Sequence, residues 1–234
     1  MTENRLLLTS DERIALWEQL AQTIEQYITK IPDAPVSPSL DPQVVRGFVA
    51  QFDFNSAQAP STVVEKVVEG LWKHQVHTPH PRYFGLFNPA PTTMGIMADA
   101  LVAVFNPQLA AWSHSPLAVE IERAVITQLG VRFGYDADST DGTFTSGGAE
   151  ANHTALLTAL VHRFPDFAEK GVRALEGQPV FYVSAQSHHS FVKATRFCGL
   201  GTDSIRQIPT DSEFRMDMSA LRAQIADDKQ AGFI

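Results

Sequence analysis

The first stretch of the chain carries apolar residues at helical spacing. They recur every four positions, at Leu16, Leu20, Ile24 and Ile28. This spacing places them on one face of a helix. Just before them, Thr9 and Glu12 have the spacing of a capping box, in which each residue bonds to the backbone of the other. The pattern therefore predicts a helix that begins after Thr9 and buries one face.

Two more amphipathic segments follow a connector that contains three prolines. Asp41-Pro42 pairs a favourable N-cap with a proline at the first helical position, and Ser61 is expected to begin a third helix. Three such helices are too few to enclose a core alone. Their apolar faces need either a subunit interface or the rest of the chain.

From about His80 the pattern changes. A loop rich in proline and aromatic residues precedes a helix of small residues over 92–105, and Ser115-Pro116 begins another helix. Short strand-like runs then alternate with helical ones. The strands are expected at 142–146, 180–184 and 204–209, and the helices at 150–162, after His188 and at 219–229. Alternation at this spacing predicts an α/β fold with a mainly parallel sheet.

The last four residues, AGFI, have the composition of a further strand. A domain that stops on the first residues of a strand would leave its sheet unfinished. We therefore interpret the sequence as a fragment or a truncated reading frame.

Composition excludes several classes of function. The 234 residues are 44% hydrophobic and 19% charged, with a net charge of −8 and no run of basic residues, which argues against nucleic acid or an anionic membrane as partner. No stretch has the apolar length of a secretory signal or a membrane span. The single cysteine, Cys198, excludes an internal disulfide and a multi-cysteine metal site. We expect a cytoplasmic protein without a metal ion.

The segment from Gly142 to Asn152 (GTFTSGGAEAN) holds the strongest candidate chemistry. A predicted strand leads through paired glycines directly into a helix, whose unpaired N–H groups favour an anion such as a phosphate ester. The segment has neither the Walker pattern nor the dinucleotide-binding pattern. A tight turn that needs glycine only for its backbone conformation remains an equal alternative.

Two adjacent histidines, His188 and His189, follow the next predicted strand. Ligands of open α/β sheets gather at the carboxyl ends of strands. A metal site would need further ligands nearby, and a serine hydrolase using Ser190 would need a GxSxG turn. Taken alone, the pair is better interpreted as one partly exposed histidine and one that caps a helix.

Four blocks together resemble a known family. HPRYFGLFNPAPT, AAWSHSPLAVEIE, TSGGAEANHTALLTAL and SAQSHHSFVKA are similar, in order and spacing, to blocks of the pyridoxal-phosphate group II amino-acid decarboxylases, which include the aromatic-amino-acid, glutamate and diaminobutyrate decarboxylases. The likeness runs from about Arg46 to the last residue. It implies the aminotransferase-like (type I) fold, here as an N-terminal helical arm (1–80, of dimer-interface type) and the first half of the large domain (81–234).

The resemblance also implies roles for individual residues. Gly147, Gly148 and Ala149 match the loop that holds the cofactor phosphate through backbone N–H groups. Relatives often have a hydroxyl at Ala149, and Ser146 beside it is expected to compensate, together with Thr145. His188, rather than His189, matches the histidine that stacks on the pyridine ring and contacts the substrate, and is the expected catalytic residue.

Asn88 and Pro89 match the loop that lines the substrate cavity, although some relatives have a hydroxyl at Pro89. The family's pyridine-nitrogen aspartate and its Schiff-base lysine, in an N-x-H-K block, both come later than this sequence extends. This chain alone is therefore expected to be inactive.

The implied function of the full-length protein is pyridoxal-phosphate-dependent decarboxylation of an L-amino acid by a homodimer. Two alternatives stay open: a pyridoxal-phosphate lyase that breaks another bond, and a non-catalytic dimerisation or cofactor-binding fragment.

Overall fold

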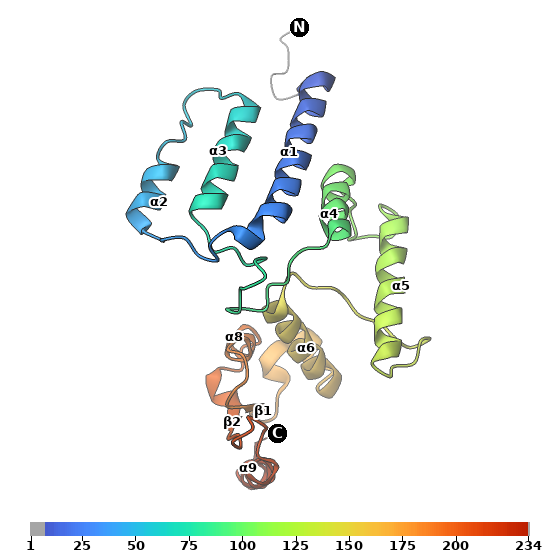
Figure 1. The fold of residues 1–234 in the computed structure, drawn as a ribbon. Coiled ribbons are helices and arrows are strands. Elements are labelled where there is room, and N and C mark those ends of the chain that lie inside the picture. Colours follow the sequence, from blue (N-terminus) through green and yellow to red (C-terminus); the bar gives the residue numbers. More distant parts are fainter. Residues whose placement is uncertain (1–7, 234) are drawn as a thin grey trace. The chain divides into compact units, whose positions relative to one another are not determined.

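The computed structural model describes residues 8–233 (Figure 1). The backbone forms two compact units, Met1–Pro107 and Gln108–Ile234. The boundary expected between residues 80 and 81 falls inside the first unit. The predicted division was by functional role, into a helical arm and a cofactor-binding domain, and not by compactness. It therefore stays a prediction. No helix among residues 8–233 is both long and apolar enough to cross a bilayer.

The first unit begins with α1 (Ser10–Lys30), and its capping box is confirmed. The backbone N–H of Glu12 donates to Thr9 Oγ1 at 3.3 Å, and the backbone N–H of Thr9 donates to Glu12 Oε2 at 2.7 Å. A short 3₁₀ turn, η1 (Ile31–Asp33), follows at the first proline of the connector. Local sequence signals therefore determine both ends of this helix.

Three further helices complete the first unit: α2 (Pro42–Val49), α3 (Pro60–Lys73) and α4 (Thr93–Phe105). Asp41 caps α2 as predicted, because its Oδ1 accepts from the N–H of Gln43 at 2.8 Å. The third helix begins at Pro60, one residue earlier than expected, since proline suits the first helical position. Helix α3 packs against α1 (Figure 1).

Two buried histidines hold the segment after α3. His77 Nε2 lies 3.2 Å from the Trp72 carbonyl oxygen, and His77 Nδ1 lies 3.1 Å from the Tyr27 hydroxyl. Since a carbonyl only accepts, Nε2 carries the proton and Nδ1 accepts from the tyrosine. His80 Nε2 likewise donates to the Ala34 carbonyl at 3.0 Å. Both rings are structural and join this segment to α1 and its connector.

The second unit alternates helices with two strands, as predicted. Its elements are α5 (Pro116–Arg132), α6 (Gly148–Arg163), α7 (Phe167–Lys170), η2 (Gly171–Ala174), β1 (Phe181–Ser184), α8 (Ser190–Phe197), η3 (Thr202–Ser204), β2 (Ile205–Ile208) and α9 (Met218–Gln230). Strands β1 and β2 pair in parallel, with Phe181 opposite Ile205. Parallel pairing needs a crossover connection, which α8 provides. The α/β class is confirmed.

The core of this unit lies between α6 and α8, which pack on each other. It consists of Leu156, Leu160, Phe167, Ala194, Cys198 and Leu200. Burial raises the pKa of the Cys198 thiol, which keeps the thiol protonated and unreactive.

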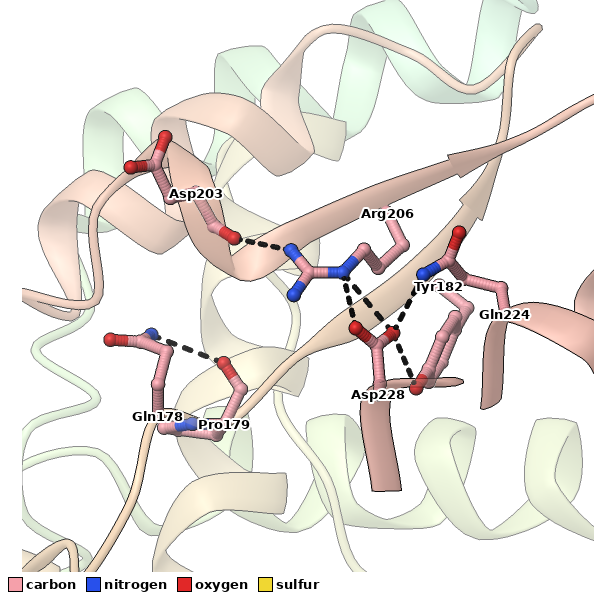
Figure 2. A network of polar contacts seen from close by, with 7 residues as sticks. All are labelled: Gln178, Pro179, Tyr182, Asp203, Arg206, Gln224 and Asp228. Atoms are coloured by element: carbon pink, nitrogen blue, oxygen red, sulfur yellow. Dashed lines mark hydrogen bonds and ion pairs between the residues drawn. The ribbon is translucent and has the colours of Figure 1, made fainter. Parts of the chain in front are cut away.

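A polar network joins the two strands to α9 (Figure 2). Arg206 Nε on β2 donates to both carboxylate oxygens of Asp228 at 2.8 and 3.1 Å. The hydroxyl of Tyr182 on β1 donates to the same carboxylate at 3.0 Å. Burial alone would raise the pKa of Asp228, but the hydrogen bonds from Arg206, Tyr182 and Gln224 outweigh it and lower the pKa.

Two strand predictions were wrong. Residues 142–146 form no strand, because their amides donate to nearby side chains instead of to a neighbouring strand: Gly142 N–H to Asp141 Oδ1, and Ser146 N–H to Glu150 Oε2, both at 2.8 Å. At the end of the chain, Ala231 and Gly232 form the turn after α9, and Phe233 lies under the Arg206 guanidinium. Ile234 lies outside the described residues.

Candidate functional site

The paired glycines form an open turn at the start of α6. Gly147 is extended (φ 173°, ψ 171°) and Gly148 is the first helical residue. A Cβ atom built on either glycine would meet no other group within 4 Å. Within residues 8–233, no side chain caps this helix at Gly147. The first amides of α6 therefore have no side-chain cap, and the binding of an anion by this turn stays a prediction.

The hydroxyl groups beside the turn are already engaged. Ser146 donates to Glu150 Oε2 from both its N–H, at 2.8 Å, and its Oγ, at 2.5 Å. These bonds, first from the Ser146 side chain and then from its backbone, lower the pKa of Glu150. Thr145 Oγ1 donates to the Gly147 carbonyl at 3.2 Å. An anion that used the Ser146 N–H would have to displace the Glu150 carboxylate.

His188 lies on the exposed loop between β1 and α8. Its Nδ1 accepts from the backbone N–H of Ser190 at 3.2 Å and lies 2.8 Å from Ser190 Oγ. His189 occupies the N-cap position of α8 but makes no side-chain capping bond. The residue that satisfies the first amide of α8 is therefore His188, and the helix-capping role predicted for one histidine belongs to it.

One connection between the two candidate segments was missed by the sequence reasoning. Asn152 Nδ2, on α6, donates to Ser190 Oγ at 2.7 Å. Ser190 is 1% exposed and also contacts the imidazole of His188. The glycine-turn helix and the candidate ring-stacking histidine are thus joined through one buried hydroxyl. The only signal in the sequence was the H-x-S spacing after β1.

The other two candidate residues belong to the first unit. Asn88 and Pro89 are exposed and lie in the loop that precedes α4.

In the described part of the chain, no group of three or more His, Cys, Asp or Glu side chains is placed to hold a metal ion. The second unit combines an uncapped helix start with an imidazole that Ser190 holds in place.

Comparison with known proteins identifies the family. The sequence model of the pyridoxal-dependent decarboxylase conserved domain matches residues 50–234. The chain belongs to this family. It is 30% identical to an aromatic-L-amino-acid decarboxylase of Bacillus atrophaeus over 99% of its length, and 31% identical to a tyrosine decarboxylase of Oryza sativa subsp. japonica over 100%. It covers 46% and 45% of these relatives, so it spans about half their length.

The fold agrees with this assignment. A crystal structure described as Oryza sativa TDC with PLP and tryptamine superimposes with a TM-score of 0.83 at 20% identity, over 97% of this chain and 48% of that one. The fold is therefore that of the pyridoxal-phosphate-dependent decarboxylases, of which this decarboxylase-family chain contains about half. The incomplete aminotransferase-like fold predicted from the sequence is confirmed.

Pyridoxal phosphate is the cofactor of the family. The second unit contains groups that fit this molecule. The open glycine turn and the free first amides of α6 suit a phosphate dianion, which needs several N–H donors and room to approach the backbone. The imidazole of His188 is exposed, so an aromatic ring can reach it, and its hydrogen bond with Ser190 holds it in place.

Proposed function

We propose that the full-length protein containing this chain is a carboxy-lyase that removes CO₂ from an L-amino acid with pyridoxal phosphate. The observation that carries the proposal is the uncapped glycine turn of α6, joined through Ser190 to His188. When bound, pyridoxal phosphate supplies an electron-accepting ring that stabilises the electron pair left by the departing carboxylate.

The chain's own contribution begins with the phosphate. The amides at Gly147, Gly148 and Ala149 hold it, and the positive end of the α6 dipole favours its charge. Ser146 joins them once the Glu150 carboxylate leaves the Ser146 N–H. These contacts would hold the cofactor by its phosphate throughout turnover.

His188 is proposed as the residue that stacks on the pyridine ring and contacts the substrate. Its position is supported by the two donors that hold its Nδ1, which leave Nε2 and the ring face for ligands. Asn88 and Pro89 are proposed to line the substrate cavity. The exposure of their loop is compatible with contact to a ligand or to another chain.

The functional assembly is proposed to be a cytoplasmic homodimer. The first unit carries an apolar groove of about 420 Å³, lined by residues of α1, α3 and α4 that include Ile24, Leu71 and Ile96. An apolar groove of this kind favours association with another protein surface. The single, buried cysteine suits a reducing compartment.

The proposal is tested by placing a charge in the phosphate seat, which is the set of backbone amides at Gly147, Gly148 and Ala149. Ala149→Asp adds a carboxylate at the second position of α6, where it favours the helix but repels phosphate. We expect pyridoxal phosphate affinity, measured by absorbance titration of the full-length protein, to fall at least about tenfold. Ala155→Asp, also exposed but further along α6, is the matched control and should change the affinity less than twofold.

The reaction is tested by incubating the full-length holoenzyme with single L-amino acids and measuring CO₂ and amine. Stoichiometric release of both products is expected for at least one amino acid. Elimination of another group, with the carboxylate retained, would replace the proposal with a lyase of another bond. Cofactor binding without any turnover would leave only a cofactor-holding role.

A further inference from the structure

Three polar side chains form a continuous hydrogen-bonded chain from α6 to the loop after β1. Asn152 Nδ2 lies 2.7 Å from Ser190 Oγ, which lies 2.8 Å from His188 Nδ1. Ser190 sits at the start of α8 and is 1% exposed, so water cannot replace either bond. The middle member of the chain is therefore fully committed to its two neighbours.

The direction of each bond follows from the chemistry of the groups. An amide nitrogen only donates, so Ser190 Oγ accepts from Asn152 and directs its own hydrogen to His188 Nδ1. The backbone N–H of Ser190 also donates to this nitrogen, at 3.2 Å. Two donors at Nδ1 leave the ring proton on Nε2.

We propose that Asn152 and Ser190 are positioning residues that hold His188 as the Nε2–H tautomer at a fixed place beside the phosphate seat. Asn152 is four residues after Gly148, which is about 6 Å along the helix axis. One helix therefore presents the phosphate-binding amides and anchors the imidazole. The inference deepens the proposed function and rests on it for the role of the ring.

The consequence for the site is a single orientation and a single donor. Rotating the imidazole would break both bonds at Nδ1 and leave the buried Ser190 hydroxyl without its acceptor, which is costly. The outward Nε2–H is then the only N–H that the ring offers to a ligand. Stacking and hydrogen bonding by His188 are thereby arranged before any ligand arrives.

The test is nitrogen NMR of the full-length protein labelled with ¹⁵N-histidine and free of pyridoxal phosphate. The His188 signals are identified by their loss in His188→Gln. In the wild type, we expect the shifts of an unprotonated Nδ1 and a protonated Nε2. Asn152→Asp replaces the donor with an acceptor, so the Ser190 hydroxyl turns toward the carboxylate and its oxygen becomes an acceptor. The Ser190 hydroxyl then no longer donates to Nδ1, but the Ser190 backbone N–H still does, so we expect part of the ring proton to move to Nδ1 and the shifts to report a mixture of tautomers.

Three further variants keep the test independent of folding defects. Ser190→Ala should give a mixture of tautomers, and Ser190→Thr, which retains the hydroxyl, should restore the wild-type shifts. Thr195→Val removes another buried hydroxyl of α8, one that donates only to the Val192 carbonyl, and should leave the His188 shifts unchanged. In the holoenzyme, Asn152→Asp and Ser190→Ala should weaken pyridoxal phosphate binding about threefold to tenfold.

The outcomes separate this inference from the proposed function. A protonated Nδ1 in the wild type, or unchanged shifts in both Asn152→Asp and Ser190→Ala, would overturn the positioning role. Wild-type shifts as expected, in a full-length protein that binds no pyridoxal phosphate, would instead leave the hydrogen-bonded chain standing and reject the proposed function.

Discussion

At the scale of single residues, Asp228 shows how a buried carboxylate stays ionised. Asp228 is 4% exposed, and its carboxylate receives hydrogen bonds from a guanidinium, a phenol and an amide (Figure 2). Without these donors, burial would favour the neutral acid. The arginine is also mostly covered, so neither charge of the pair has bulk water as an alternative partner.

Removing the Asp228 charge should therefore destabilise the protein. We expect Asp228→Asn to lower the free energy of unfolding by about 3 kcal/mol at pH 7, because the covered guanidinium of Arg206 loses its counter-charge. Urea denaturation measures this difference. Asp166→Asn, which breaks an exposed ion pair with Lys170, is the control and should cost less than about 1 kcal/mol.

The same pair gives a pH dependence with a definite sign. The folded-state pKa of Asp228 is lowered, so its stabilisation is complete above the unfolded value of about 3.9 and is lost as the pH falls through the folded-state pKa. The difference between wild type and Asp228→Asn should therefore shrink in acid. A difference that stayed constant between pH 7 and pH 2 would contradict the ionised pair.

Individual site residues were predictable only where their signal is local. The glycines at 147 and 148 are adjacent to the helix that they begin, so the turn was found from the sequence. Asn152 and Ser190 are 38 positions apart, and neither residue type alone marks a hydrogen-bonded chain. Such a pair is revealed only when packing brings α6 and α8 together.

At the scale of elements, α6 matters most because it carries the glycine turn at one end and core leucines along one face. Leu156 and Leu160 lie one turn apart and pack against α8, whereas Leu157 is 40% exposed. The position of the amides at the helix start therefore depends on apolar contacts more than two turns away.

Truncating the buried leucine should test this dependence. Leu160→Ala is expected to lower the unfolding free energy by about 2–5 kcal/mol, because it removes buried methyl groups and leaves a cavity. Leu157→Ala, on the exposed face of the same helix, should change it by less than about 1 kcal/mol. Equal effects of the two variants in urea denaturation would show that the face of α6 is assigned wrongly.

Helix ends were predicted better than strands. Thr9 and Asp41 cap α1 and α2 through contacts within three residues, which a sequence pattern reveals directly. Thr92, which was expected to be the first residue of its helix, caps α4. A strand exists only when another segment pairs with it. The apolar and polar alternation at 142–146 could not show that its amides donate instead to the side chains of Asp141 and Glu150.

At the scale of the whole molecule, charge and exposed apolar surface act against each other. The described residues include many exposed large apolar side chains, such as Phe84, Phe87 and Phe105. Surfaces of this kind favour association, and the net charge of −8 opposes it through mutual repulsion. The balance between these effects should shift strongly with pH.

Self-association should therefore be greatest near pH 5.4, where the net charge of the chain vanishes. Static light scattering as a function of pH measures this effect. At pH 8, where repulsion is restored, we expect association to fall and added salt to increase it by screening. Scattering that is independent of both pH and salt would mean that charge does not limit association.

The hydrogen bond from Asn152 to Ser190 also has a consequence in time. It closes a loop of 38 positions, and such closures follow the formation of local helical turns during refolding. The turns of the helix that begins at Gly148 can form early, because their hydrogen bonds are local. The imidazole acquires its orientation only after α8 has docked. A newly synthesised molecule would then pass through an interval in which the turns of α6 exist but neither its first amides nor the imidazole is yet fixed in place.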